Sequence, residues 1–449
     1  MKIIEFDILV IGSGIAGQTV AKTCVKEGLT VAIADNREYG GTCANRGCDP
    51  KKVLLGPTEI WESAKKLNKE GITSIPKLNW KKLQKFKRKF TQPVPLAREK
   101  ELSGLGIKLY HQSPKFIDEN TLSIEGKTIR AQKIVIATGQ VPRKLNFTGS
   151  KFLKSSDDFL KLKKLPNKII IIGAGFVGME LAHMAARAGS KVLVLEVGNR
   201  ILNDFDKDLS EHLLQVSKQL GIKFNFNVEI SKLKKLRKNY VVNYIVDEKK
   251  HSQKARLIFN TAGRVPSIDD LNLKKGNVHY SKKGVQVNEY LQNTGNPNVY
   301  ACGDVSDHSL PLSPLSSVEA VIVSENILHN NRKKIDIAVV PTVAFTIPNL
   351  ASVGLSEEVA KKRYKNVIVN YQSVPYWYNA KRINLEEYAY KIIINERTKI
   401  ILGAHILSPY AAETINLFTM AINMELTTDA LKSMIFTYPT WANDIKSMI

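Results

Sequence analysis

One pattern occurs twice in the chain and constrains its fold more than any other feature. Each copy has an apolar run, a G-x-G-x-x-G loop, a helical stretch and a second apolar run that ends in an acid; the copies span residues 6–35 and 168–196. This is the plan of a βαβ unit that binds a dinucleotide. We therefore predict an α/β fold with two Rossmann-like dinucleotide-binding domains.

The glycines of each loop have separate tasks. The first allows a tight turn, the second lets the backbone approach a pyrophosphate, and the third lets the helix pack against the strand. They are Gly12, Gly14 and Gly17 in the first copy and Gly173, Gly175 and Gly178 in the second. The phosphates are expected at the helix N-terminus, where free N–H groups and the dipole favour anions. Two complete copies predict that one chain binds two dinucleotides.

The acids that close the two copies are Asp35 and Glu196. Each follows its first glycine by about 20 residues, the offset of an acid that binds a ribose hydroxyl. A carboxylate accepts a hydrogen bond from a 2′-hydroxyl but repels a 2′-phosphate. Lys191 and Arg200 are the only cations close to Glu196 in the sequence. The second copy is therefore expected to bind NADH, and NADPH stays open.

Two cysteines, Cys43 and Cys48, follow the first copy at a predicted loop-to-helix junction. In an intracellular protein a close pair is more often redox-active or metal-binding than structural. A metal site needs further Cys or His at short spacing, and none is nearby, so no metal is predicted. A helix N-terminus lowers the pKa of a thiol, which favours a thiolate at Cys48. Cys24 and Cys302 are expected to be small buried residues.

Composition and charge limit the partners. Four cysteines are too few for an extracellular scaffold, and the apolar N-terminus lacks the features of a signal peptide. No apolar run reaches the roughly 18 residues of a membrane span. The net charge of +24 is spread along the chain and comes mostly from Lys. We expect a soluble cytoplasmic protein with a Lys-rich surface that binds neither nucleic acid nor membrane.

Further motifs make the whole chain resemble the flavoprotein disulfide reductases, which include glutathione reductase, dihydrolipoamide dehydrogenase, trypanothione reductase and mercuric reductase. They appear in family order: G-G-T-C-x-N-x-G-C-x-P-K from residue 40, A-T-G from 137, A-G-R-x-P from 262, C-G-D from 302, and P-T-V-x-F-T-x-P-x-L-A-S-V-G-L from 341. The resemblance implies an FAD-binding domain at 1–149 and 267–335, an NAD(P)-binding domain at 150–266, and a C-terminal α+β dimerisation domain at 336–449. In that last domain we expect helices near 356–364, 409–423 and 427–433.

The resemblance also assigns residues. The expected FAD contacts are Gly12, Ser13, Gly14, Gly17, Asp35, Gly41, Thr42, Lys51, Lys115, Thr138, Gly139 and Asp304. The expected nicotinamide nucleotide contacts are Gly173, Gly175, Phe176, Gly178, Glu196 and Gly263, with Phe176 as an aromatic gate. The implied catalytic residues are Cys43, Cys48, Lys51, Glu180 and Tyr438, with Lys51 and Glu180 paired beside the flavin.

The implied reaction has two halves. NADH passes a hydride to FAD, and reduced FAD opens a Cys43–Cys48 disulfide. Cys48 then lies against the flavin as a thiolate, while Cys43 attacks the disulfide of the substrate. Return attack by Cys48 resolves the mixed disulfide. The family is homodimeric, because the last domain completes the active site of the partner.

The chain departs from the family at its C-terminus. The family ends in H-P-T-x-x-E, whereas here Tyr438 stands in the place of the His and Asn443 in that of the Glu, with Asp444 one residue late. With a reference pKa of about 10, a Tyr is a poor base near neutrality but a serviceable hydrogen-bond donor. Tyr438 therefore either packs only, or donates a proton or binds an unusual acceptor.

Two more departures concern the substrate. Arg46 and Asp49 put charges into the redox motif; Asp49 is expected to raise the pKa of Cys48 and Arg46 to oppose it. Glutathione reductases carry arginines in the first helix, where this chain has Thr19-Val-Ala-Lys22. We expect a small-molecule or protein disulfide other than glutathione. The alternative is a non-disulfide acceptor: a quinone, a metal ion or oxygen.

Overall fold

The computed structural model describes residues 3–449 and divides the chain into two compact units. The first holds the chain up to Val53, with Lys85–Arg143 and Gly263–Asp336; the second holds Leu54–Gln84, Lys144–Ala262 and Ile337–Ile449. Helices α3 (Cys48–Lys66) and α4 (Trp80–Thr91) each begin in one unit and end in the other. The predicted nicotinamide-binding domain, apart from residues 263–266, and the predicted dimerisation domain, apart from Asp336, fall in the second unit.

The first unit is built on a seven-stranded sheet, and β18 pairs with β6 beside the main path. In spatial order the strands are β3 (Lys108–Tyr110), β2 (Val31–Ala34), β1 (Ile3–Ile11), β6 (Lys127–Ile136), β5 (Thr121–Ile124) and β4 (Lys115–Phe116), with β18 (Val299–Ala301). The parallel register sets Ile11 opposite Ala34 and Ile136, and Ala301 opposite Ile136. The loops after these four strands therefore leave the sheet at one edge, the usual ligand edge of a parallel sheet.

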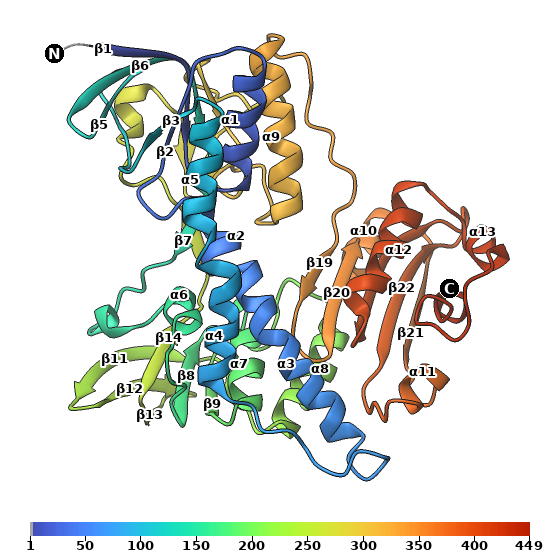
Figure 1. The fold of residues 1–449 in the computed structure, drawn as a ribbon. Helices are drawn as coiled ribbons and strands as arrows, with labels where there is room; N and C mark the ends of the chain where they lie inside the picture. The colour runs from blue at the N-terminus through green and yellow to red at the C-terminus, as the bar shows by residue number, and fades with distance from the viewer. Residues whose placement is uncertain (1–2) are drawn as a thin grey trace. The chain divides into compact units, whose positions relative to one another are not determined.

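Helices α1 (Ile15–Lys26) and α9 (Ser313–Leu328) of this unit lie side by side (Figure 1). Each helix comes, in the sequence, after a strand that ends at the ligand edge: α1 follows β1 and α9 follows β18. The remaining elements of the unit are α2 (Gly41–Arg46), α5 (Val94–Gly104), β7 (Gln140–Pro142), β15 (Arg264–Pro266), β16 (Tyr280–Ser281), β17 (Gly284–Val285) and a 3₁₀ turn at Leu273–Gly276.

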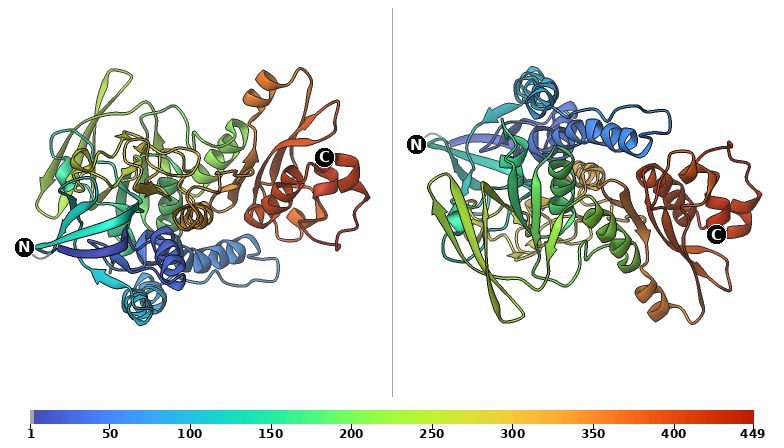
Figure 2. Two further views of the ribbon diagram at one scale, coloured as in Figure 1. Left: turned by 90° about the horizontal axis from the view of Figure 1, so that it is seen from above. Right: turned by 90° about the horizontal axis from the view of Figure 1, so that it is seen from below.

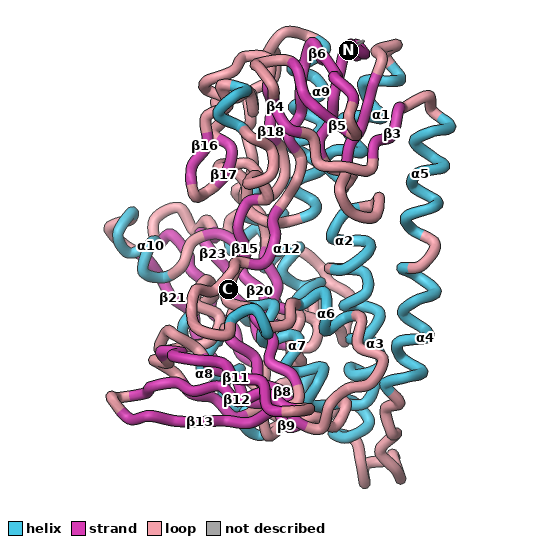
Figure 3. Tube along the Cα trace, turned by 90° about the vertical axis from the view of Figure 1, so that its left-hand side faces the viewer, coloured by secondary structure: helices cyan, strands magenta, loops and turns pink. Residues whose placement is uncertain are grey.

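The second unit repeats this plan with a four-stranded parallel sheet: β10 (Lys223–Asn225), β9 (Lys191–Leu195), β8 (Lys168–Ile172) and β14 (Leu257–Asn260). Around it lie α6 (Ser156–Leu160), α7 (Phe176–Arg187), α8 (Lys207–Gln219) and a 3₁₀ turn at Ser150–Phe152. An antiparallel meander follows α8 and β10; it consists of β11 (Glu229–Leu236), β12 (Asn239–Val246) and β13 (Lys249–Ala255) (Figure 3).

The last third of the chain forms a five-stranded antiparallel sheet with the order β19 (Thr342–Ala344), β20 (Asn349–Gly354), β23 (Ile401–Ser408), β22 (Ala389–Asn395) and β21 (Val367–Ser373). Its helices are α10 (Glu357–Arg363), α11 (Tyr378–Lys381), α12 (Ala411–Asn423), α13 (Thr428–Ser433) and α14 (Ile445–Met448). The three helices expected here are confirmed as α10, α12 and α13.

Alternating side chains give this sheet two apolar faces. Tyr390 and Ile392 of β22 join the cluster that contains Ile415 of α12, which packs on β20 and β23 (Figure 2). Ala389 of β22 and Leu407 of β23 join the cluster that holds residues of α7 and α8. Within residues 3–449, no helix combines the length and the apolar content needed to cross a bilayer.

Candidate active site

The two glycine loops have the strained backbone that their sequence predicts. Gly12 has a φ of +110°, and a Cβ there would lie 2.3 Å from the carbonyl oxygen of Ala137. Gly173 has a φ of +103°, and its Cβ would lie 2.7 Å from the oxygen of Thr261. Only glycine tolerates this geometry, because both the conformation and the space exclude a side chain.

A second glycine contact brings the redox motif onto the first loop. Gly41 has a φ of +70°, and a Cβ there would lie 2.5 Å from the Cα of Gly14. The backbone of α2, which carries Thr42 and Cys43, therefore lies directly against the start of α1.

The two predicted ribose-binding acids are held in the same way. Asp35 Oδ2 accepts from the backbone N–H of Ser13 at 2.8 Å and from its hydroxyl at 2.6 Å. Glu196 Oε2 accepts from the N–H of Ala174 at 2.5 Å, and Oε1 accepts from Gly198 at 2.8 Å. Ser13 and Ala174 each follow the first glycine of their loop, so each acid is fixed at the mouth of its loop.

Helices α1 and α7 begin without a side-chain cap. Their N-cap residues are Gly14 and Gly175, and neither helix has an acid in its first turn. The first backbone N–H groups of a helix have no partner within the helix. Both helix starts therefore suit a phosphate, which accepts such N–H groups and is favoured by the helix dipole.

Other predicted FAD contacts lie at the same edge of the first unit. Thr138 and Gly139 follow β6, and Asp304 follows β18. Burial raises the pKa of Asp304, and the guanidinium of Arg264 opposes that rise. The Thr138 hydroxyl is buried and has no hydrogen-bond partner within residues 3–449.

Lys115 is the predicted FAD contact that this arrangement does not bring together with the others. It is exposed on β4, the edge strand, and β5 and β6 separate β4 from β1. Gly263 lies at the start of β15, with a φ of +100°, and its carbonyl accepts from the N–H of Arg143 at 3.0 Å. Phe176 is exposed at the first position of α7.

Both thiols of the predicted redox pair are free, as are Cys24 and Cys302, which are fully buried as expected. Cys48 opens α3, while Cys43 lies half-buried in α2. The hydrogen bond from the Cys43 thiol lowers the pKa of Cys48 to about 6, with Ser313 and Lys51 acting in the same direction. The same hydrogen bond, together with burial, raises the pKa of Cys43.

The effects of the charged residues in the redox motif on the pKa of Cys48 agree only in part with the prediction. Asp49 raises the pKa of Cys48, as expected, but the cation that opposes it is Lys51. Arg46 is buried, and its guanidinium lies 3.0 Å from the Glu38 carboxylate. Its charge is therefore paired with Glu38, while Lys51 is the cation that lowers the pKa of Cys48.

Glu180, a predicted site residue, lies in a buried polar row on α7 with His183 and Arg187. This row was not predicted. Glu180 Oε1 accepts from the N–H of Phe345 at 2.9 Å. One turn further, His183 Nδ1 accepts from the N–H of Ile347 at 3.2 Å, and Arg187 donates to the Ile347 carbonyl at 3.0 Å. Three side chains on one helix face thus hold one segment of the second unit.

The row continues into two further helices. The Ser217 hydroxyl donates to the Leu213 carbonyl at 2.6 Å, so it accepts from His183 Nε2, 2.9 Å away. His183 is therefore neutral with its proton on Nε2, and burial lowers its pKa well below the usual value. Arg187 Nε lies 2.7 Å from Glu62 of α3. The spacing of Glu180, His183 and Arg187 along α7 was the available sequence signal.

Tyr438 is 69% exposed, and its ring centroid lies 6.2 Å from that of Tyr378. Asp444 does not orient it. The Asp444 carboxylate accepts from Asn379 at 3.1 Å and from the Tyr388 hydroxyl at 3.2 Å. Burial raises the pKa of Asp444, whose role is therefore in the packing of its own domain.

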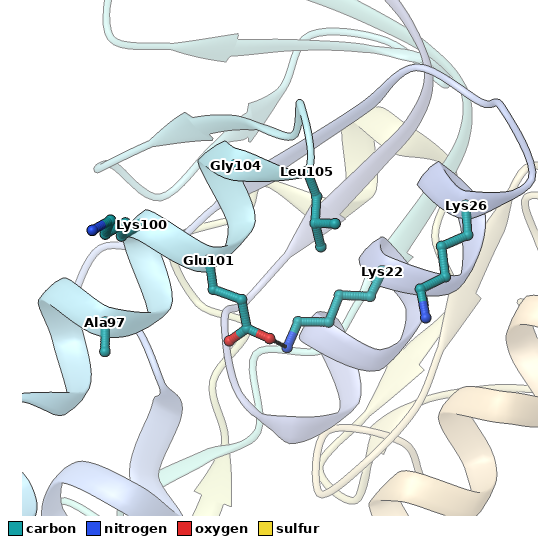
Figure 4. A pocket seen from close by; sticks show the side chains of 7 residues that line it. All are labelled: Lys22, Lys26, Ala97, Lys100, Glu101, Gly104 and Leu105. Carbon is teal, nitrogen blue, oxygen red and sulfur yellow. Dashed lines mark hydrogen bonds and ion pairs between the residues drawn. The ribbon is translucent and has the colours of Figure 1, made fainter.

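An open cleft of about 650 Å³ lies between α1 and α5 of the first unit (Figure 4). Lys22, the residue in place of the glutathione reductase arginines, lies in its wall with its ammonium 2.5 Å from Glu101. Arg98 also binds Glu101, at 2.7 Å. Lys26 and Lys100 are the other basic residues of the cleft, and Ala97, Gly104 and Leu105 line the rest.

Comparison with known proteins gives matches along almost the whole chain. The pyridine nucleotide-disulphide oxidoreductase model matches residues 6–325, and the dimerisation domain of the same family matches residues 340–449. The chain belongs to the pyridine nucleotide-disulphide oxidoreductase family. Mercuric reductase of Staphylococcus aureus is 30% identical over 98% of this chain and 81% of its own length. Dihydrolipoyl dehydrogenase of Chlamydia muridarum is 31% identical over 97% and 94%.

A solved structure of the family has the same fold. It is a copper(II) complex of a cysteine-to-serine variant of RclA, the HOCl-induced flavoprotein disulfide reductase of Escherichia coli. The TM-score is 0.89 with 24% sequence identity, and 99% of each chain is covered. The predicted fold class, two dinucleotide-binding domains and a C-terminal dimerisation domain, is confirmed. The chain is an NAD(P)H-dependent flavoprotein disulfide oxidoreductase.

The described residues fit the FAD of this family. A Cβ at Gly14 would meet no atom closer than the Cα of Gly41, at 4.0 Å, so the backbone at the start of α1 borders open space. The buried Thr138 hydroxyl makes no hydrogen bond within residues 3–449, so its donor and acceptor suit a cofactor. FAD, when bound, supplies the carrier that accepts a hydride and delivers two electrons to a disulfide.

Proposed function

We propose that this enzyme transfers electrons from NADH, through FAD on the first glycine loop, to the Cys43–Cys48 disulfide and then to a disulfide other than glutathione. The observation that carries the proposal is the unequal pair of thiols. The pKa of Cys48 is lowered to about 6, while that of Cys43 is raised. The reduced pair therefore holds one thiolate and one thiol at neutral pH.

This division of charge suits two separate tasks. Cys48, with Lys51 lowering its pKa, is the thiolate that faces the flavin. Cys43 gives up its proton and attacks the substrate disulfide; a new S–S bond forms, the substrate S–S bond breaks, and one substrate thiolate leaves. Cys48 then attacks the Cys43 sulfur, which restores the Cys43–Cys48 disulfide and releases the second thiolate. Lys51 and Glu180 are proposed as the pair beside the flavin.

The nucleotide preference rests on the Glu196 carboxylate. It is fixed at the end of β9, where a 2′-phosphate would meet its negative charge. The nearest cation in sequence, Arg200, donates to the carbonyls of Asn203 and Phe205, which hold its guanidinium within its own loop. These contacts support NADH over NADPH. Glu196→Ser should narrow the ratio of kcat/KM for the two nucleotides, and an unchanged ratio would contradict the assignment.

The cleft in Figure 4 supports an acceptor other than glutathione. The ammonium of Lys22 is already neutralised by Glu101, whose own pKa is lowered by Lys22 first and Arg98 second. A carboxylate of glutathione would have to compete with Glu101 for that charge.

A second candidate acceptor is a thiophilic metal ion. One relative is a mercuric reductase, and the matched RclA structure is a copper(II) complex. The observation that favours a metal ion is Tyr438, which stands in the place of the acid–base His of the family. Disulfide exchange uses such an acid–base residue, whereas thiolates bind soft metal ions without one.

For a disulfide acceptor, Tyr438 has a different proposed role. In a homodimer Tyr438 is proposed to reach the thiols of the partner subunit, where its hydroxyl can donate a proton to a leaving thiolate.

Anaerobic titration of the purified protein with NADH tests the proposal. Two-electron reduction should produce a long-wavelength thiolate-to-flavin charge-transfer band, which Cys48→Ser abolishes. Cys24→Ser is the matched control, because Cys24 is buried away from the redox motif. Direct bleaching of the flavin with no such band would refute the role of the thiols. A panel of disulfides, copper(II) and mercury(II) then separates the two acceptor classes.

A further inference from the structure

We propose that helix α4 binds the enzyme to a membrane of anionic lipids, with two phenylalanines at the boundary between headgroups and acyl chains and a row of lysines against the headgroups. The helix spans Trp80–Thr91 and reads W-K-K-L-Q-K-F-K-R-K-F-T. It carries none of the residues of the glycine loops or of the redox pair. Membrane binding is therefore a property beyond the electron transfer proposed above and does not depend on it.

One face of α4 is packed against the protein. Trp80 is part of a hydrophobic core cluster, and Leu83 packs against that cluster. Trp80 Nε1 donates to the Leu162 carbonyl at 2.7 Å. Gln84 and Lys87 are also buried. Residues 80, 83, 84 and 87 are spaced three and four apart, so they form one helical stripe, and its packing fixes which side of α4 is turned outward.

Two phenylalanines of α4 stay outside this packing. Phe86 is 45% exposed and Phe90 is 51% exposed. They lie about one turn apart, and their rings meet edge to face with centroids 5.2 Å apart. At about 100° per residue, both project from the flank of the helix next to Leu83. The pair therefore forms one exposed apolar edge along the helix.

The cations of α4 occupy the side opposite the packed stripe. Lys82, Lys85 and Lys89 project away from that stripe. Lys81 and Arg88 lie beside them, and all five side chains are exposed. The helix contains no Asp or Glu, so no acid of α4 offsets these charges. Basic helices that lie in a membrane interface combine an aromatic edge with a Lys-rich face in this way.

The combination of charge with apolar rings selects a bilayer of acidic lipids as the partner. Its headgroups complement the lysines, each of which contributes about fivefold to binding near an anionic surface. The layer just beneath the headgroups is apolar and accepts the rings. A single-stranded nucleic acid would meet the same cations, but successive bases stack on aromatic ring faces. Phe86 and Phe90 stand at 81° to each other and offer no such pair of parallel faces.

The geometry of α4 gives shallow binding without insertion across the bilayer. The helix has 12 residues, which makes it about 18 Å long. A hydrocarbon core is roughly 30 Å thick. Because the Trp80 side of α4 stays packed on the protein, only the phenylalanine edge and the lysine side meet lipid. Much of the attraction acts between exposed charges, so binding should be peripheral, reversible and weaker at high salt.

Co-sedimentation of the purified, FAD-loaded enzyme with lipid vesicles tests this assignment. The vesicles contain phosphatidylcholine, either alone or with about one third phosphatidylglycerol. The enzyme should sediment with the anionic vesicles at low salt, and roughly 0.5 M KCl should release it. With phosphatidylcholine alone it should stay in the supernatant. Phe86→Ser combined with Phe90→Ser keeps every charge and should weaken binding by about tenfold or more, because two half-exposed rings no longer enter the interface.

A matched pair of charge variants separates the site on α4 from the net charge of the protein. Lys85→Gln combined with Lys89→Gln removes two charges from α4 and should weaken binding about 25-fold, at about fivefold for each lysine. Lys249→Gln combined with Lys250→Gln removes the same charge from exposed positions of β13 and should bind almost like the wild type. Reduction of the flavin by NADH should be equal in all variants, which shows that they fold and that lipid binding is separate from electron transfer.

The opposite results overturn the assignment. Absence of binding to the anionic vesicles refutes it, as does equal binding to phosphatidylcholine alone. Equal weakening by the α4 and β13 lysine variants would assign the attraction to the net charge of +24. Binding to a single-stranded oligonucleotide that is tighter than binding to vesicles and unaffected by the phenylalanine variant would assign α4 to nucleic acid. If the double phenylalanine variant does not keep flavin reduction, Phe90→Ser alone replaces it and should weaken binding about threefold or more.

Discussion

Replacing Cys43 with Ala should move the ionisation of Cys48. The hydrogen bond from Cys43 is the largest cause that lowers the Cys48 pKa to about 6 from the ordinary 9.0. Without it the pKa rises towards 9.0, because burial and Asp49 still oppose ionisation while Ser313 and Lys51 retain part of the lowering. At pH 7 the thiolate fraction is about 90% at a pKa of 6 and about 1% at a pKa of 9.

Alkylation of the reduced protein by iodoacetamide measures this change in the pKa of Cys48. The rate at a single pH is not enough to detect it. A thiolate with a pKa higher by 3 is also intrinsically more nucleophilic, by roughly 16- to 32-fold for a Brønsted slope of 0.4–0.5. The roughly 90-fold loss of thiolate is therefore largely offset, and the rate at pH 7 falls only about three- to sixfold. The midpoint of the rate–pH profile, by contrast, moves from near pH 6 towards pH 9.

The assay is therefore the full profile from pH 5 to 9.5, followed by mass spectrometry of the labelled peptide. Cys24 and Cys302 are fully buried and should stay unlabelled. Ser313→Ala removes a smaller cause and should shift the midpoint upward by less than Cys43→Ala. A midpoint that remains near 6 in Cys43→Ala would refute the reasoning, because another group would then be holding the thiolate.

Three further changes test other parts of the structure. Arg187→Leu leaves the partly buried Glu62 carboxylate without its partner and should cost about 3–5 kcal/mol in urea unfolding, part of which Glu62→Leu restores in the double variant. Gly173→Ala places a Cβ near the Thr261 carbonyl at a φ of +103° and should cost about 1–3 kcal/mol in unfolding and weaken NADH binding in a fluorescence titration. Tyr438→Phe should lower turnover of a disulfide by tenfold or more while stopped-flow reduction of the flavin by NADH stays unchanged; equal turnover would mean that the ring only packs.

The sequence predicted the parts of the site that depend on local backbone geometry. Gly12 and Gly173 are required by a turn whose dihedral angles exclude other residues, and the strand and helix around each turn can be recognised within 30 residues. In the C-terminal domain, helices α10, α12 and α13 were predicted, but the short helices α11 and α14 and strands β21 and β23 were not. The segment of β23 contains Gly403 and His405 within its apolar run, which hides the strand pattern.

The parts that were missed depend on contacts between distant segments. Lys391 lies in an apolar strand, yet it is 3% exposed and its ammonium binds Asp206, Asp208 and Glu357. No local pattern indicates that acids from α8 and α10 meet this lysine. The buried carboxyl of Glu319 on α9 could not be predicted for the same reason, because it accepts a hydrogen bond from Gly303, which lies in the turn after β18.

The number of protons that the thiol pair can supply to the substrate restricts the choice of acceptor. It does so more than the shape of the cleft between α1 and α5 does. Reduction of a disulfide to two thiols takes up two protons, and the reduced pair holds one of them, on Cys43. Tyr438 is the residue in the sequence position of the missing base, and a phenol gives up a proton more readily to a basic alkyl thiolate than to an acidic aromatic one. An acceptor whose leaving thiolate has a low pKa needs no such donor. If Tyr438 is the proton donor, Tyr438→Phe should slow reduction of alkyl disulfides and spare aromatic disulfides; equal slowing of both would assign Tyr438 to binding instead.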